Sequence, residues 1–351
     1  MKNIRVFFTV LTTLFAFLVL MPICADSSQN QKIYLYGESH GIKKILEKEF
    51  ELWHKHYHTQ GMRHLFLELP YYTAQFLNLW MKSDNNDILN QLYDDMAGTQ
   101  ACVPELKVFY ENIKKQCPQT IFYGTDVGHQ YDTTGARYLE YLKDKGLEKT
   151  EEYTLALKAV EQGKHYYSNK SDPIYRENKM TENFVQALGS LKGESIMGIY
   201  GSAHTDPEGM DNFTRSVPCM ANQLKKQYKD ALYTESLSSL ALRSIPLRVD
   251  SIKIAEKSYK ASYFGKQNMS GLNKNFKHRE FWRLEDAYDD FKDMPKTGDV
   301  LPYRNFPMVV EKGQVIIIDY ARADDSLKRM YYRSDGNEWK KQPTTEEFKI
   351  K

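Results

Sequence analysis

Short apolar runs that end in glycine or an ionisable residue recur between residues 33 and 204 of this chain. Each run is followed by a segment whose apolar residues recur at helical spacing. Runs of this length, bounded by residues that break regular structure, are typical of buried strands. The alternation therefore predicts an α/β fold, with a mostly parallel sheet flanked by helices on both faces. The predicted strands are Ile33–Tyr36, Leu65–Leu67, Ile121–Tyr123 and Ile196–Tyr200.

Two of the predicted helices carry clear end signals. Apolar residues recur from Ile42 at a spacing of three or four, and Gly61 closes that helix. Asp172 followed by a proline predicts the start of another helix, which runs to about Leu191. On that second helix Arg176, Met180 and Asn183 share one face. An arginine and an asparagine on such a face suit a helix that leans over a polar pocket.

The sequence changes character after about residue 235. Met308–Val310 and Gln314–Tyr320 predict one hairpin, and Met330–Arg333 and Glu338–Lys340 predict a second. We therefore divide the chain into residues 1–25, an α/β domain at 26–235 and a β-rich extension at 236–351. The extension is expected to pack on the same domain.

The N-terminus reads as a secretory signal peptide over residues 1–25. Lys2 and Arg5 precede the apolar run Val6–Leu20, and a cleavage site lies before Asp26. We expect an exported protein, whether secreted, periplasmic or at the cell surface. Acylation of Cys24 as a lipoprotein is the alternative, although the bulky residue before it argues against this. No later stretch is apolar enough to span a bilayer, so no integral membrane domain is expected after the leader is removed.

Composition and net charge limit the classes of molecule that this protein is expected to bind. The net charge is +2 and both signs are interspersed, so we expect no nucleic-acid partner. A small-molecule or peptide substrate is the expected partner. The 25 tyrosines are more simply explained as amphipathic edges of the core than as a surface for ligands or saccharides.

Cys102 and Cys117 flank a predicted helix that would hold them about 20 Å apart, too far for a disulfide. Free thiols, or a bridge to Cys219, are expected.

Ionisable residues follow all four of these predicted strands. Glu38 and His40 follow the first strand, Glu68 the second, Asp126 the third and His204 the last. Because parallel strands end at the same edge of a sheet, these side chains are expected to meet there. The alternative is that such residues cap the following helices, as Asp126 could.

The pattern Gly-x-x-His occurs twice, at residues 37–40 and 201–204. A glycine there allows a close backbone approach, and a histidine just past a strand end can bind a metal or transfer a proton. His129 lies just after Asp126, where a loop histidine is more often solvated than part of a pocket.

Two modes of water activation are compatible with these residues. His40, Glu68 and His204 could hold a divalent metal such as Mn, Co or Zn, which would make a bound water nucleophilic. Without metal, a His40 oriented by carboxylates could deprotonate water itself. A further alternative is a serine hydrolase, because residues 37–41 also spell G-x-S-x-G and Ser39, Asp126 and His204 follow in order. This serine would lie on the first strand, with no earlier strand to supply an oxyanion loop.

An ordered set of short motifs resembles the erythromycin esterase-like superfamily. That group includes the erythromycin esterases, the TraB/PrgY/GumN proteins with the Tiki proteases, and the ChaN-type haem-binding lipoproteins. The resemblance covers about residues 33–230. Its motifs are GESHG at 37–41, LELP at 67–70, YGTD at 123–126, RENKM at 176–180 followed by Asn183, and GSAH at 201–204.

The resemblance implies a hydrolase that cleaves an ester, lactone or amide. It makes His40 the general base or a metal ligand, with Glu38 and Glu68 as carboxylate partners. His204 would be the second histidine of the site, and Arg176 would contact a substrate anion or developing oxyanion. Residues that would line the substrate are Asp126, Asn183 and Ser39.

Relatives of the ChaN type supply the main alternative, a protein that binds haem, iron or another ligand without turnover. His40 or His204 would then be an axial ligand. The spacing within GESH matches the Tiki and ChaN-type groups, since the esterases have one more residue between the glutamate and the histidine. The YGTD and RENKM segments are closer to the esterases.

Overall fold

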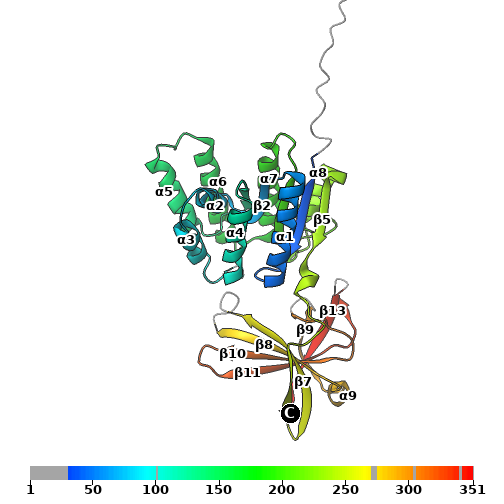
Figure 1. Ribbon diagram of the computed structural model, residues 1–351. Helices are drawn as coiled ribbons and strands as arrows, with labels where there is room; N and C mark the ends of the chain where they lie inside the picture. The colour runs from blue at the N-terminus through cyan, green and yellow to red at the C-terminus, as the bar shows by residue number, and fades with distance from the viewer. Residues whose placement is uncertain (1–30, 100–101, 270–274, 303–305, 340–341, 351) are drawn as a thin grey trace, which may run out of the picture.

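The computed structural model describes residues 31–99, 102–269, 275–302, 306–339 and 342–350 (Figure 1). The predicted leader and Cys24 lie outside these residues. Within them, no helix is both long and apolar enough to cross a membrane. The chain forms a helix-covered parallel sheet followed by a separate antiparallel sheet, which confirms the predicted fold class.

The first part alternates strands and helices, as the sequence predicts. Its strands are β1 (Ile33–Glu38), β2 (His64–Pro70), β3 (Ile121–Asp126), β4 (Ile196–Gly201) and β5 (Leu232–Ser236). Its α-helices are α1 (Lys43–Gln60), α2 (Tyr71–Met81), α3 (Asp87–Asp95), α4 (Pro104–Gln116), α5 (Ala136–Asp144), α6 (Glu151–Ser168), α7 (Pro173–Gly189) and α8 (Met220–Tyr228).

The five strands are parallel, in the order β3-β2-β4-β1-β5. The crossover from β3 to β4 therefore places β4 between β1 and β2. In this register Gly201, at the end of β4, lies beside Glu38, at the end of β1. The two Gly-x-x-His motifs thus start on neighbouring strands.

Alternating strand residues face two apolar clusters, one on each side of the sheet. Leu65, Leu67 and Ile199 pack with α1 to α6, whereas Phe66 and Tyr200 pack with α7 and α8. Covering both faces leaves only the edges of the sheet and the ends of its strands open to solvent. The carboxyl ends of the strands are therefore the place where polar side chains can gather.

Local signals set the helix ends. Gly61 closes α1 in the left-handed conformation, with φ 69°. The carboxylate of Asp172 accepts a hydrogen bond from the amide of Ile174 at 2.9 Å and caps α7.

Helix α4 separates Cys102 from Cys117, and these two cysteines and Cys219 are free thiols. The expectation that Cys102 and Cys117 do not pair is therefore confirmed.

The C-terminal part is an antiparallel sheet with a buried apolar cluster on each face. The predicted β-rich extension is therefore confirmed, and its packing on the α/β part stays a prediction. Its elements are β6 (Arg248–Ile254), β7 (Lys257–Asn268), β8 (Phe276–Leu284), α9 (Tyr288–Phe291), β9 (Lys296–Pro302), β10 (Val315–Arg322), β11 (Leu327–Arg333), β12 (Glu338–Trp339) and β13 (Gln342–Phe348).

Both predicted hairpins are wrong in their pairing. Strand β10 pairs with β8 and β11, whereas Met308 makes an isolated bridge to Arg243. Strand β12 pairs with β13 rather than with β11. The runs that correspond to β10, β11 and β12 do form strands, whereas Met308–Val310 does not, and the pairing of strands is decided by the sheet as a whole.

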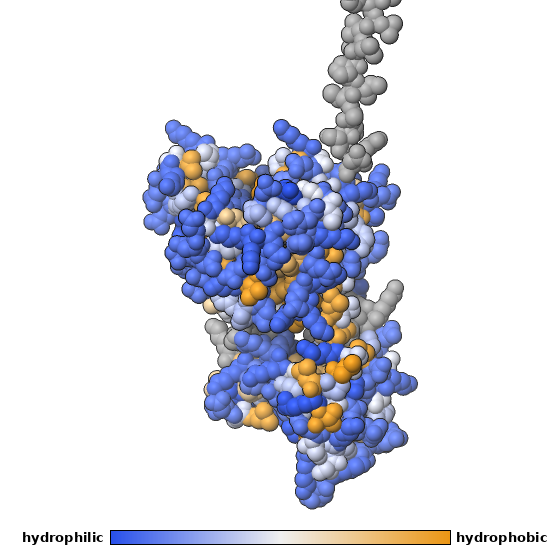
Figure 2. All heavy atoms as spheres, viewed as in Figure 1, coloured by the Kyte–Doolittle hydropathy of each residue, from blue (hydrophilic) through white to orange (hydrophobic). Residues whose placement is uncertain are grey.

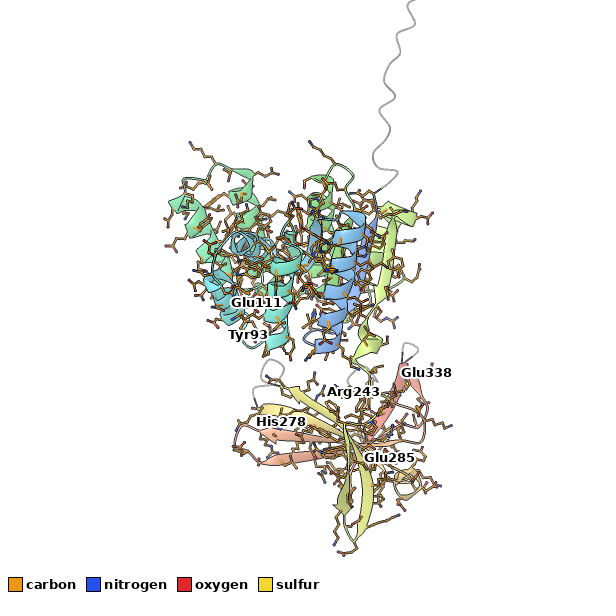
Figure 3. All side chains as sticks on the ribbon, in the orientation of Figure 1. Tyr93, Glu111, Arg243, His278, Glu285 and Glu338 are labelled. Carbon is orange, nitrogen blue, oxygen red and sulfur yellow. The ribbon has the colours of Figure 1, made fainter. Side chains whose placement is uncertain are left out.

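The linker to the C-terminal sheet leaves from the carboxyl edge of the parallel sheet. The amide of Leu237, which follows β5, donates to the carbonyl of Gly37 at 2.7 Å. Further on, Arg243 exchanges backbone hydrogen bonds with Pro307 and Val309 and so ties the linker to the second part (Figure 3). Apolar side chains are visible around this junction (Figure 2). The C-terminal sheet is therefore attached at the edge that carries the polar residues (Figure 1).

Candidate functional site

The carboxyl ends of β1, β2, β3 and β4 bring the predicted polar residues into one cluster. Its centre is Glu68, with Oε1 3.8 Å from Nε2 of His40 and 3.6 Å from Nε2 of His204. Arg176, from the first turn of α7, reaches the same oxygen at 2.5 Å. Residues far apart in the sequence thus share one site, as their positions at strand ends predict.

His40 is held between two carboxylates. Its Nδ1 lies 2.9 Å from Oε1 of Glu38, while the distance from Nε2 to Glu68 is longer than a hydrogen bond. The His40 side chain is 31% exposed, so part of it can be reached from solvent. Burial by itself lowers the pKa of His40, but the charges of Glu38 and Glu68 outweigh burial and raise this pKa to about 9.

Glu68 is an ionised carboxylate surrounded by positive groups. Its Oε2 accepts a hydrogen bond from the amide of Gly201 at 2.5 Å. Burial acts to raise the pKa of Glu68, but the charges of His204, Arg176 and His40 lower it to about 2. Glu68 therefore stays negative at neutral pH and favours the protonated form of both histidines.

Arg176 forms a two-pronged ion pair with Asp126. Its Nε donates to Oδ1 at 3.0 Å and its Nη2 to Oδ2 at 2.6 Å. Despite burial, the charges of Arg176 and His129 hold the pKa of Asp126 far below its usual range. The remaining nitrogen, Nη1, lies 3.3 Å from Nε2 of His204. Of the face of α7 that was predicted to lean over a polar pocket, Arg176 reaches the site, whereas Met180 packs in the apolar core.

The structure adds Glu177, which the sequence reasoning did not single out. Its Oε1 lies 2.6 Å from Nδ1 of His204, and its Oε2 accepts from the amide of Met220 at 2.9 Å. Burial lowers the pKa of His204, but the charge of Glu68 and the bond to Glu177 outweigh burial and raise it. The signal was present in the RENKM motif, where a glutamate directly follows Arg176.

His129 is also part of the cluster. Its Nε2 lies 2.9 Å from Oδ2 of Asp126, which is completely buried. Its Nδ1 lies 2.6 Å from the hydroxyl of Tyr167 on α6. The interpretation of His129 as a solvated loop residue is therefore wrong, because both ring nitrogens have protein partners.

Ser39 and Asn183 lie near the site but bind other partners. The Ser39 hydroxyl donates to the hydroxyl of Ser238 at 3.2 Å, whereas the nitrogens of His204 face Glu177, Glu68 and Arg176. A serine nucleophile activated by His204 is therefore not assembled. Asn183 donates to the carbonyl of Thr125 at 3.2 Å and so ties α7 to the end of β3.

Close packing explains the glycines of the repeated motif. A Cβ atom on Gly201 would lie 3.1 Å from Nε2 of His40 and 3.2 Å from Oε2 of Glu68. A Cβ atom on Gly37 would lie 2.2 Å from Oγ1 of Thr205. Both glycines therefore allow close approach at the site, and neither has a positive φ.

The donor set does not fit the predicted metal ion. His40, Glu68 and His204 converge, but the guanidinium of Arg176 contacts Glu68 and His204 and already supplies the positive charge. In the part of the chain that the structure describes, no three His, Cys, Asp or Glu side chains are arranged to hold a metal. Nε2 of each histidine also faces charged groups, which do not match the largely apolar faces of a haem.

The fold and the site together define an α/β protein with a histidine, carboxylate and arginine cluster at the carboxyl edge of its parallel sheet. No family model matches the sequence, and no curated protein matches it. Solved structures do resemble the fold, and a mutant of the erythromycin esterase EreC in its open conformation is one of them. The EreC overlap has a TM-score of 0.44 at 10% identity and covers 61% of this chain and 71% of that chain.

Two further solved structures overlap to a similar extent. A Bacillus cereus protein has a TM-score of 0.42 at 12% identity, covering 60% of this chain and 67% of that chain. A succinoglycan biosynthesis protein has a TM-score of 0.40 at 15% identity, covering 59% of this chain and 66% of that chain. All three overlaps are partial and of low identity, so the chemistry is argued from the site itself.

Proposed function

We propose that this chain is an exported hydrolase that activates water with His40, without a metal ion, to cleave an ester, lactone or amide. The observation that carries the proposal is the placement of His40. Its Nδ1 is bonded to Glu38, its Nε2 faces Glu68 at 3.8 Å, and the His40 side chain is partly exposed. A carboxylate at Nδ1 selects the neutral tautomer whose Nε2 accepts a proton.

The bond-making step follows from this geometry. Nε2 of neutral His40 accepts a proton from water as the water oxygen attacks the substrate carbonyl carbon. The tetrahedral intermediate then collapses, the carbon–heteroatom bond breaks, and the imidazolium of His40 returns the proton to the leaving group. Glu38 and Glu68 stabilise the imidazolium that exists between these two events.

Positive charge beside His40 suits the developing oxyanion. Arg176 is fixed by Asp126 and Glu68, so its guanidinium needs no reorganisation during the reaction. His204, held by Glu177, presents Nε2 on the same side of Glu68. We assign these two residues to stabilising the oxyanion and positioning Glu68.

The test is hydrolysis by residues 26–351 of a panel of 4-nitrophenyl esters, lactones and amides. His40→Ala is expected to lower kcat/KM by about 10²- to 10⁴-fold. His58→Ala removes a histidine outside the site, which bonds the carbonyl of Gln116, and is expected to leave kcat/KM unchanged. Activity is also expected to survive exhaustive chelation.

Three results would contradict the proposal. Turnover that persists in His40→Ala would remove this residue as the base, and turnover lost on chelation would restore the metal-dependent alternative. A purified protein that turns over none of these substrates but shows a visible absorption band would instead support the haem- or ligand-binding alternative.

A further inference from the structure

A group of aromatic rings lies directly beside Asp126 and takes no part in the proposed hydrolysis. We call Tyr131, Tyr166, Tyr167 and His129 the tyrosine platform. The centroid of the Tyr167 ring lies 5.0 Å from that of Tyr166, 6.1 Å from that of Tyr131 and 5.8 Å from that of His129. Tyr167 is 45% exposed. Tyr167 therefore places a partly exposed aromatic side chain next to His129 and Asp126.

Hydrogen bonds join this exposed ring to the reaction centre. The Tyr167 hydroxyl lies 2.6 Å from Nδ1 of His129, whose Nε2 lies 2.9 Å from Oδ2 of Asp126. Asp126 in turn binds Arg176, which binds Glu68. An exposed surface tyrosine usually turns its hydroxyl to water. Here the hydroxyl is held by His129 although the Tyr167 side chain is exposed.

The backbone beneath the platform is also fixed. A Cβ atom on Gly128 would lie 2.1 Å from the carbonyl oxygen of Ala159, so the loop after β3 packs directly on α6. The hydroxyl of Tyr72 donates to the carbonyl of His129 at 2.5 Å. The platform is therefore preorganised, which reduces the entropy lost when a ligand binds.

The chemistry of the platform indicates what it binds. The partly exposed aromatic side chain of Tyr167 suits a ligand with a flat apolar face. Asp132 and Thr133 are the exposed polar residues that follow Tyr131 in a short π-helix (Tyr131–Gly135), and they suit a ligand whose edges carry hydroxyl groups. A sugar ring has both features, and tyrosine provides rigid, amphipathic contact area for such ligands. We propose that the platform is a saccharide subsite, so that the bond cleaved at His40 is an acyl ester carried on a sugar. This inference rests on the proposed function.

The test compares acylated saccharides with an ester that lacks a sugar. The probes are O-acetylated xylo-, cello- and chito-oligosaccharides, with 4-nitrophenyl acetate as the reference. In Tyr167→Ala, the ratio of kcat/KM for the best saccharide ester to that for the reference is expected to fall about tenfold, mainly through KM. Tyr233→Ala is the matched control, because Tyr233 is 47% exposed but lies on β5, outside the platform.

Binding of deacetylated oligosaccharides to the full chain carrying His40→Ala separates the two proposals. Saccharide binding that Tyr167→Ala removes would support the subsite even if no ester is hydrolysed, in which case only the proposed function fails. Hydrolysis of 4-nitrophenyl acetate with an unchanged ratio in Tyr167→Ala would overturn the subsite and leave the function standing. If Tyr167→Ala lowered kcat/KM equally for a bulky aryl ester without hydroxyl groups, the assignment of the platform to sugars would be overturned.

Discussion

The amide of Gly201, at the end of β4, donates a hydrogen bond to Oε2 of Glu68, at the end of β2. This contact exists because β4 lies between β1 and β2 and because Gly201 carries no side chain. It fixes the carboxylate that faces His40, His204 and Arg176. A backbone group therefore positions the centre of the site.

Gly201→Ala is expected to lower activity while the protein stays folded. The added methyl group would lie 3.1 Å from Nε2 of His40, tighter than ordinary contact, and would displace the imidazole or Glu68. We expect kcat/KM to fall by about 10²-fold, as displacements near 1 Å do in active sites. Gly189→Ala is the control, because a Cβ atom there meets nothing within 4 Å. Equal activities of the two variants would show that the close approach of Gly201 to His40 and Glu68 does not affect catalysis.

The dependence of activity on pH follows from the environment of His40. The active base is the neutral imidazole, so kcat/KM should rise with pH and level off above a pKa of about 9. In Glu38→Gln a negative charge that raises this pKa is lost, and the inflection should move to lower pH. The plateau should also fall, by about 10²-fold, because the tautomer is no longer selected. A pH profile that is the same in both proteins would exclude His40 as the titrating base.

Arg176→Ala should destabilise the protein strongly. The substitution leaves Asp126 and Glu68 buried without their principal cation, which costs about 3–5 kcal/mol of unfolding free energy. Arg137→Ala is a matched control, because Arg137 makes a 2.6 Å ion pair with Asp95 but is 35% exposed. Its loss should cost about 1 kcal/mol or less. Denaturant unfolding near neutral pH measures the loss of unfolding free energy in each variant. Equal losses would contradict the prediction that the buried ion pairs of Arg176 stabilise the protein more than the exposed pair of Arg137.

Glu49 on α1 should make stability depend on pH. This carboxyl group is buried, its Oε1 has no hydrogen-bond partner, and burial followed by the charge of Glu38 raises its pKa well above 4.5. Below pH 4.5 Glu49 is protonated in both the folded and the unfolded protein. Because its pKa is raised only in the folded protein, the free energy of unfolding decreases as the pH rises above 4.5.

Glu49→Gln should therefore increase the unfolding free energy at pH 8 by about 1–3 kcal/mol, and by much less at pH 4. Glu47→Gln, on the exposed side of the same helix, should change stability little at either pH. An increase that is the same at both pH values would show that ionisation of Glu49 is not the cause.

The sequence by itself determined four of the five strands of the parallel sheet and the residues at their ends, whereas β5 was not predicted. These features obey local rules. An apolar run bounded by breakers forms a buried strand, and the residues directly after the run lie at the edge of the sheet. For the same reason Gly61 and Asp172 marked the ends of their helices correctly.

Only the tertiary structure decided which residues meet. The order of strands brings Glu68 and Gly201 together. The packing of α7 turns Glu177 toward His204, and the loop after β3, which packs on α6, brings His129 to Asp126. Strand pairing in the C-terminal sheet likewise differs from both predicted hairpins. Such contacts depend on the direction in which a side chain points and on which strands neighbour one another. Both are set by burial of the apolar faces of the whole domain rather than by any short stretch of sequence.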